Sequence, residues 1–553
     1  MIKKGCVMDK PVFTLGLTMA GAISAGSYTA GVIDFLLEAL KEWENEKINN
    51  PEVYPYDVKI NAISGASAGG MTAAIMTAML GGKFETTDNN LYKSWVEDIH
   101  IDRLLANKDL IENNAIHSIL DSTVLEEITQ QALNVMPNED EWPSYVSEYL
   151  HVLISVANLH GVPYHVEFQG ETEDKEKEIK QHGMLMHEDF MHFIFSKEDP
   201  VIQNVRFADS AIWLNSKNYQ DQRWKVLGNS ALASGAFPLG FASRQLRRNR
   251  ANYDNREWLI NLDCISCDGN EQVKGYQYST IKPSWPKEMS TQYTFNGIDG
   301  GLMNNEPFEL LTSLLSDEKC ISSNDHPFSA LLMIDPFPQN NLLDLTQSIQ
   351  KLDILGVFKG MFSALKNQAR FKLEEIKRSK LNDSQLRFLI SPTRSNKKGL
   401  PIASGSLDGF GGFLSRGFRE HDFFLGRRNC QYFLSQHFTL HRTHPLYKDV
   451  KKDLYSTIRK KEDNIPIIPL CGTAKETIER PTWPKYTYSE LEKLQRQIKK
   501  RITALSERAI ENHIDGFWSR QILKVLLWFK KDAIAKSISM KIAEDLKKNG
   551  LLN

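Results

Sequence analysis

The segment VKINAISGASAGGMTAAIMTAML, residues 58–80, contains a turn of small residues between two apolar runs. The first run, residues 58–64, predicts a buried β-strand. The second run, residues 71–80, is rich in alanine and methionine and predicts a buried helix that ends at Gly81-Gly82. A strand that turns directly into a helix is the building unit of parallel sheets, so this segment predicts an α/β fold.

A second unit of the same kind precedes it. VFTLGLTM (12–19) predicts a buried strand, a loop of small residues follows, and residues 28–47 have apolar side chains at helical spacing. Further along, we predict buried strands over 328–337 and 386–392, an amphipathic helix over 356–379, and a β-hairpin over 151–168 that turns at His160-Gly161.

The composition of the chain argues against several classes of function. Among 553 residues, 67 Lys and Arg nearly balance 69 Asp and Glu, so no nucleic-acid partner is expected. No run approaches the roughly 18 apolar residues of a membrane span, and MIKKGCVMDKPVF lacks the apolar core of a signal peptide. No Cys or His cluster has the spacing of a zinc site, so no metal is expected. We therefore expect a cytoplasmic protein that contacts a membrane only peripherally, at its inner face.

Composition and residue pattern divide the chain into three parts. We predict a catalytic domain over residues 1–445, a linker over 446–488 and a basic helical segment over 489–553. The last segment begins with a predicted capping box, Ser489–Glu492, and holds fourteen Lys and Arg against eight Asp and Glu, a local charge of +6. Two interpretations stay open for it: a helix packed on the body, or a basic amphipathic element on anionic lipid.

Gly65-Ala66-Ser67-Ala68-Gly69 fits the G-x-S-x-G pattern and lies between the predicted strand and helix. Such a turn forces the serine into strained dihedral angles, and only small neighbours fit around it. The hydroxyl then projects at a helix N-terminus, where developing negative charge is favoured. Ser67 is therefore the candidate nucleophile.

The earlier loop, GAISAG (21–26), also holds a serine, but Ser24 lacks the first glycine of the pattern and follows the β-branched Ile23. A small-residue loop between strand and helix is better suited to offering backbone N–H groups to an oxyanion. It does not match the G-x-G-x-x-G pattern of a nucleotide-binding loop. We interpret one loop as the attacking element and the other as the stabilising one.

A serine nucleophile needs a base, and FNGIDGGLMNNEP (295–307) offers Asp299 at the end of a probable strand. Gly300 and Gly301 behind it allow a close approach to another loop.

Together these motifs resemble the patatin-like phospholipase family, the serine lipid acyl hydrolases found in bacteria. The glycine-rich oxyanion loop corresponds to residues 21–32, the elbow to Gly65–Gly69 and the D-G-G motif to Asp299–Gly301, all in the family's order. ALASGAFPLGF (231–241) also resembles a family segment, and the motifs span residues 11–310 with an extension to about 435.

The resemblance implies a three-layer α/β/α fold with a mainly parallel sheet and a C-terminal helical addition. It implies a Ser67–Asp299 dyad without histidine that forms an acyl-enzyme, and an oxyanion hole from the N–H groups of Gly21, Ala22 and Ile23. The substrate is then a phospholipid or another acyl ester at a membrane surface, with no metal or cofactor.

One departure keeps alternatives open. Ala22, Ile23 and Ala25 replace two glycines and an arginine of the family's G-G-G-x-R-G loop, and a β-branched residue does not easily take positive φ. A catalytically weak, patatin-shaped lipid-binding or scaffold protein is one alternative. Another is an α/β-hydrolase triad that uses Asp335 with His421 or His441.

Two further patterns bear on the substrate. Five arginines, at positions 244, 247, 248, 250 and 256, cluster after residues 231–241 and either meet anionic headgroups or form a solvated basic loop. The aromatic, glycine-rich residues 409–434 either line an acyl pocket or close the core.

Overall fold

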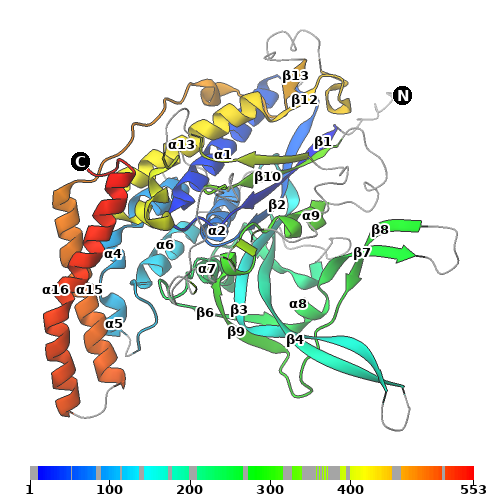
Figure 1. Ribbon diagram of the computed structural model, residues 1–553. Coiled ribbons are helices and arrows are strands. Elements are labelled where there is room, and N and C mark those ends of the chain that lie inside the picture. Colours follow the sequence, from blue (N-terminus) through cyan, green and yellow to red (C-terminus); the bar gives the residue numbers. More distant parts are fainter. Residues whose placement is uncertain are drawn as a thin grey trace, which may run out of the picture.

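Nine strands form the central sheet of the protein (Figure 1). Their order is β11-β10-β1-β2-β3-β4-β5, and β9 pairs with both β3 and β6. The pairs β11–β10, β10–β1, β1–β2, β2–β3 and β4–β5 are parallel. The sheet comprises β1 (Val12–Met19), β2 (Asp57–Gly65), β3 (Val146–Glu171), β4 (Lys177–Ser196), β5 (Ile212–Asn215), β6 (Arg244–Asn249), β9 (Gln292–Asp299), β10 (Ser329–Ile334) and β11 (Leu386–Ile390). The predicted α/β class with a mainly parallel sheet is confirmed.

The computed structural model describes most of the chain. Its described residues are 10–50, 53–82, 89–112, 115–135, 142–171, 177–197, 208–265, 272–315, 327–338, 386–393, 399–450, 463–513 and 517–553, with single positions at 357, 360, 364, 367, 368 and 370. The helix that we predict over 356–379 lies outside the described residues apart from those single positions.

Helices cover both faces of the sheet. The main ones are α1 (Gly26–Asn49), α2 (Ala68–Gly81), α6 (Thr123–Leu133), α7 (Gln222–Ser234), α9 (Phe308–Leu315) and α13 (Arg416–Gln436). Shorter ones are α3 (Asn90–Tyr92), a π-helix η2 (Lys93–Asp98), α4 (Ile101–Leu104), α5 (Lys108–Glu112), α8 (Arg250–Asp254) and α12 (Gly411–Leu414). Within the described ranges, no helix is both long and apolar enough to span a bilayer.

Successive side chains along each strand point to opposite faces of the central sheet. Gly16, Ala62 and Leu331 lie in one row across β1, β2 and β10, and α9 packs on this row. Ile154 of β3 points to the opposite face, where it contacts Gly70 of α2. Helix α7 packs beside α2, and α1 continues that layer to α13. The three-layer α/β/α arrangement is therefore present.

Helices α1 and α13 cross closely at two glycines. A Cβ atom on Gly31 would collide with the Phe423 carbonyl, and one on Gly426 would collide with the Tyr28 carbonyl. A side chain at either position would push the helices apart, so glycine is required for this contact.

The predicted hairpin at His160-Gly161 is wrong. Strand β3 continues through these residues, and its hairpin partner is β4, which follows it in the chain. The register with β4 shifts between Ala157 and Val162, where Gly161 adopts φ +74°. Asn158 Oδ1 accepts the N–H groups of His160 and Gly161 at 3.0 and 2.9 Å. This local turn is a bulge within one strand, and a bulge uses the same turn residues as a hairpin.

Residues that we expected to form a linker pack on the main body. Strand β13 (Asn464–Pro466) pairs with β12 (Thr439–His441), and Ile467 and Ile468 are fully buried in the main core. In the described part of 446–488, the chain therefore contributes to the core of the body.

The C-terminal segment is a pair of helices, α15 (Tyr488–His513) and α16 (Phe517–Lys548), which lie side by side at the left edge of Figure 1. Leu494, Ile498, Ala535 and Leu546 form the buried contact between this pair and the body. The capping box lies two residues before the predicted one. The Thr487 N–H donates to Glu490 Oε2 at 2.7 Å, and the Glu490 N–H donates back to Thr487 Oγ1 at 3.2 Å.

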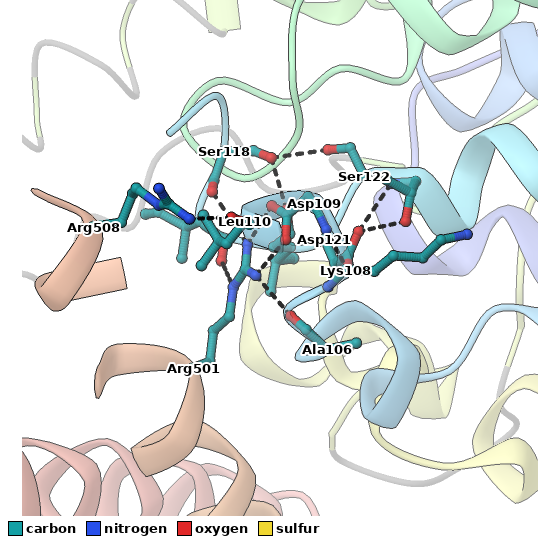
Figure 2. Close-up of polar contacts among 12 residues, drawn as sticks. Ala106, Lys108, Asp109, Leu110, Ser118, Asp121, Ser122, Arg501 and Arg508 are labelled. Carbon is teal, nitrogen blue, oxygen red and sulfur yellow. Dashed lines mark hydrogen bonds and ion pairs between the residues drawn. The ribbon is translucent and has the colours of Figure 1, made fainter. Parts of the chain in front are cut away.

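Arg501 anchors α15 to the segment 106–122 (Figure 2). Its side chain is 2 % exposed and forms a bidentate pair with Asp109, at 2.6 and 2.7 Å. It also donates to the carbonyls of Ala106 at 2.6 Å and Ile119 at 2.8 Å. Next to it, Arg508 donates to the Leu110 carbonyl at 2.5 Å. Because these partners of the buried guanidinium all lie on one short segment, Arg501 holds that segment against α15.

We expect Arg501→Ala to weaken this attachment by about 3–5 kcal/mol, because it removes the bidentate ion pair with Asp109 and the hydrogen bonds from Arg501 to two carbonyls. Hydrogen–deuterium exchange of residues 488–513 measures the loss as faster local opening. Lys493→Ala is the control: Lys493 pairs with Asp102 at 2.5 Å but is 57 % exposed, so removing it costs at most about 1 kcal/mol. Equal protection of α15 in wild type and Arg501→Ala would contradict the anchor.

Candidate functional site

Ser67 lies at the turn between β2 and α2, and its backbone is strained. It adopts φ 53° and ψ −126°, a region that residues with side chains rarely occupy, and it is the N-cap of α2. A Cβ on Gly65 would collide with the Gly69 backbone, and one on Gly69 would collide with the Met19 carbonyl. Neither position has room for a side chain.

Asp299 lies beside Ser67, 232 residues later in the chain. The Ser67 hydroxyl donates to Asp299 Oδ2 at 2.9 Å, and the two side chains are buried, at 6 % and 4 % exposed. Asp299 is the last residue of β9, opposite Val156 of β3, and its N–H donates to the Ala236 carbonyl at 3.0 Å. A buried hydroxyl that donates to a carboxylate can be deprotonated as it attacks an electrophile.

The two glycines after Asp299 bring its loop against β3. A Cβ on Gly300 would collide with the Ser155 carbonyl, so the backbone approaches β3 more closely than any other residue allows. The Gly301 N–H donates to Asp299 Oδ1 at 2.8 Å. One carboxylate oxygen is therefore fixed by the backbone while the other accepts from Ser67.

Ser234 supports the strained turn, and the sequence did not single it out. Its hydroxyl accepts the Ser67 N–H at 2.9 Å and donates to the Ser155 carbonyl at 2.7 Å. It is fully buried. Only its place in ALASGAFPLGF, between small residues and a proline, could have drawn attention to it.

Ser24 of the first loop has a structural role. Its hydroxyl donates to the Gly409 carbonyl and accepts the Gly412 N–H at 2.9 Å. A Cβ on Gly412 would collide with this side chain. Ser24 therefore joins the first loop to the segment that includes η5 (Ala403–Gly409) and α12.

The backbone of the first loop lies next to Ser67, but it differs from expectation at two positions. A Cβ on Gly21 would lie 3.1 Å from Ser67 Cβ, yet the Gly21 N–H donates to the Asn305 carbonyl at 3.1 Å. Gly21 is therefore not a free donor. Ile23 adopts φ 49° despite its β-branched side chain, and among the described residues the N–H groups of Ala22 and Ile23 donate no backbone hydrogen bond.

The alternative triad is not assembled around Ser67. Asp335 forms an ion pair with Arg370 at 2.8 Å. His421 Nδ1 lies 2.7 Å from Asp422, and His441 Nδ1 lies 2.7 Å from Thr443 Oγ1. The Ser67 hydroxyl instead meets Asp299.

A buried acidic residue lies behind the Asp299 loop. Glu306 follows Asn305, whose side-chain amide donates to it at 2.9 Å, and Arg370 lies 2.7 Å away. Burial raises the pKa of the Glu306 carboxyl to about 7, while Arg370 opposes the rise.

The arginine cluster does not form a common surface. Arg248 and Arg256 are buried, at 2 % and 4 % exposed, and Arg256 pairs with Asp189 at 2.8 Å. Arg244 pairs with Glu126 on α6. Although burial acts in the opposite direction, Arg256 and Arg248 hold the pKa of Asp189 below its usual value. These three arginines hold the fold together, so a five-arginine headgroup site is not present.

A small, mainly apolar cavity adjoins Ser67. Its walls include Ile23, Met71, Trp95, Phe237, Phe241 and Phe413. Phe413 comes from the aromatic segment 409–434, whose larger part, α13, packs on α1. That segment therefore contributes both to the cavity and to the core. No group of three or more acidic, Cys or His side chains suited to a metal occurs among the described residues.

Comparison with known proteins shows the family of the chain. A sequence model of the family described as "Patatin-like phospholipase" matches residues 17–312. The "Uncharacterized protein y4iI" of Sinorhizobium fredii is 30 % identical over 605 aligned positions, which cover 98 % of this chain and 83 % of the relative. The crystal structure of VipD from Legionella pneumophila aligns with 97 % of this chain and 88 % of its own, at 12 % identity and a TM-score of 0.25.

We expect Ser234→Ala to lower the free energy of unfolding by about 1–3 kcal/mol, because the buried Ser67 N–H and Ser155 carbonyl lose their partner. It should also slow labelling of Ser67 by a fluorophosphonate about tenfold or more. Ser230→Ala on the same helix is the control, since its hydroxyl donates only to the Val226 carbonyl one turn earlier. Identical labelling rates in the two variants would show that Ser234 does not position Ser67.

Proposed function

Because the chain belongs to the patatin-like phospholipase family, we propose that it hydrolyses carboxylic esters of phospholipids, with Ser67 as nucleophile and Asp299 as general base. The observation that carries this proposal is the 2.9 Å hydrogen bond between two buried side chains that lie 232 residues apart in sequence. The strained backbone of Ser67 supports it further, because such strain is concentrated at functional sites.

The reaction follows from this geometry. Ser67 Oγ attacks the ester carbonyl carbon while its proton passes to Asp299 Oδ2. The tetrahedral intermediate collapses to an acyl-enzyme, and Asp299 returns the proton to the departing alcohol. Water then attacks the acyl carbon, again losing a proton to Asp299, and the carboxylic acid leaves as Ser67 regains its proton. The N-terminus of α2 at Ser67 favours the negative charge that develops during each attack.

The oxyanion donors are the N–H groups of Ala22 and Ile23. Gly21 is excluded by its hydrogen bond to the Asn305 carbonyl. The positive φ of Ile23 places a left-handed residue in the turn that adjoins Ser67, and turns of this kind can bind anions through successive N–H groups. Donors fixed in advance stabilise the oxyanion without reorganisation.

We expect Ser67→Ala and Asp299→Asn each to lower hydrolysis at least about a thousandfold. Mass spectrometry of fatty acids released from mixed phospholipid vesicles measures the loss. His441→Ala is the control: the exposed His441 belongs only to the alternative triad, so the dyad retains activity in this variant. If His441→Ala abolished hydrolysis and Asp299→Asn retained it, the result would favour the triad. Failure of a fluorophosphonate to label Ser67 in folded wild type would favour a patatin-shaped lipid-binding protein.

The C-terminal helices supply a surface for anionic membranes. On α16, Lys530, Ile534, Ile538 and Lys541 are exposed and lie on one face, at steps of three and four residues. Ile534 and Ile538 are 41 % and 38 % exposed. Exposed apolar residues flanked by lysines on one helix face suit the boundary between anionic headgroups and acyl chains.

We expect wild type to sediment with vesicles that contain anionic phospholipid and to stay in solution with purely zwitterionic ones. Replacing Ile534 and Ile538 together by Glu should reduce the bound fraction severalfold. Leu185→Glu, at a position 53 % exposed on β4, is the matched control and should bind as wild type does. Equal binding by the double variant would rule out this face.

A further inference from the structure

Asn305 lies at the junction of the two loops that meet at Ser67. Its backbone carbonyl accepts the Gly21 N–H at 3.1 Å. Its side-chain oxygen touches both loops, because a Cβ atom on either Gly21 or Gly301 would collide with Asn305 Oδ1. Asn305 is buried, at 7 % exposed. One buried amide therefore sets the spacing between the first loop and the loop of Asp299.

The two glycines that Asn305 touches are next to the proposed dyad. A Cβ atom on Gly21 would lie 3.1 Å from Ser67 Cβ, and one on Gly301 would lie 3.1 Å from Asp299 Oδ1. The Gly301 N–H also donates to that carboxylate oxygen at 2.8 Å. A shift of the amide would therefore move the backbone beside both side chains. A displacement of about 1 Å is enough to slow a reaction between oriented groups about a hundredfold.

Glu306 orients the Asn305 amide. Asn305 Nδ2 donates to Glu306 Oε1 at 2.9 Å, and the same oxygen accepts from Arg370 at 2.7 Å. Arg370 in turn pairs with Asp335, the residue directly after β10, at 2.8 Å. A carboxylate accepts hydrogen bonds, so it selects the NH₂ end of the amide and leaves the oxygen end to face the two glycines.

The charge of Glu306 decides how strongly it holds the amide. Its side chain is fully buried, and among the described residues its second oxygen, Oε2, has no hydrogen-bond partner. Burial raises the pKa of this carboxyl to about 7; Asp335 also raises the pKa, whereas Arg370 and the Asn305 amide lower it. Arg370 and Asp335 are the charged side chains of the described residues that act most on it. A carboxylate forms a hydrogen bond roughly twice as strong as a neutral oxygen does, so the amide is held best above neutral pH.

We propose that Asn305 is a positioning residue for the reactivity of Ser67 and that ionised Glu306 keeps the Asn305 amide in place. The inference rests on the proposed function, because it concerns the same Ser67–Asp299 pair. Asn305 and Glu306 do not touch the reacting atoms but act through the glycines of the two loops. The site is then most reactive when the Glu306 carboxyl is charged, and it loses reactivity as pH falls through the pKa of that group.

The first test is the rate at which a fluorophosphonate labels Ser67, a reaction that needs the dyad but no lipid. Asn305→Ala should slow labelling at least about tenfold, because the amide that spaces the two loops is gone. Asn304→Ala is the matched control: Asn304 is also buried, at 5 % exposed, but its side chain donates to Glu188 at 2.9 Å. Asn304→Ala should be labelled at the wild-type rate, and equal slowing in both variants would count against a positioning role of Asn305.

The second test is the pH profile of labelling, which a purely structural role of Glu306 would not affect. Between about pH 6 and pH 8, on either side of the pKa of Glu306, the wild-type rate should rise at least about threefold. Glu306→Gln keeps an acceptor for Asn305 but not the charge, so its rate should stay near the low wild-type value at both pH values. Asp335→Asn removes a charge that raises the pKa of Glu306, so its profile should shift to lower pH.

These tests separate the inference from the proposed function. Glu306→Gln preserves the size of the side chain, so its profile decides the question even if Asn305→Ala does not fold. The same pH profile in wild type and Glu306→Gln would overturn the inference. A wild-type protein that is labelled at Ser67 but releases no fatty acid from phospholipid vesicles would defeat the proposed function, while the labelling rates would still decide the role of Asn305.

Discussion

The backbone of Ser67, at φ 53° and ψ −126°, is the constraint on which the rest of the site depends. Such a conformation costs about 1–3 kcal/mol and persists only where the surroundings hold it. Here β2 leads into it, Gly69 packs on the Met19 carbonyl, and the Ser234 hydroxyl accepts the Ser67 N–H. The three supports come from β1, β2 and α7, so the sheet and the helix layer must both be formed before the hydroxyl is correctly aimed.

The same supports also hold the carboxylate. The residues just after α7 accept the Asp299 N–H at Ala236, and Ser155 of β3 meets both Ser234 and Gly300. One small region, where β3 passes between α7 and the Asp299 loop, therefore sets both partners of the 2.9 Å hydrogen bond. In the proposed two-residue site, no third side chain orients the base. The orientation of Asp299 toward Ser67 therefore depends on the backbone that holds it.

Features that depend on neighbouring residues in the chain were predicted correctly. The strand 12–19 has the bounds of β1, and the elbow lies between β2 and α2 because small residues there have few alternatives. Local patterns failed where two interpretations fit the same residues. Thr487–Glu490 and Ser489–Glu492 both fit a capping box, and the residues of the bulge at Gly161 also fit a hairpin turn. Apart from the Ser67–Asp299 pair, which the family resemblance implied, the contacts between distant residues at the site were not predicted. The roles of Ser234, of Arg501 and of the carbonyl that occupies the Gly21 N–H depend on residues more than a hundred positions away.

The positive φ of Ile23 shows how far tertiary contacts override local preference. An isoleucine disfavours this conformation, yet the neighbouring Ser24 is held by Gly409 and Gly412, which lie 385 and 388 residues downstream. During synthesis on the ribosome, the N-terminal loop is therefore made long before the segment that shapes it. The nascent chain can build its first strands and helices early, but the first loop gains its contacts with Gly409 and Gly412 only after about three quarters of the polypeptide has been made. Until then the growing chain carries Ser67 without the finished first loop beside it.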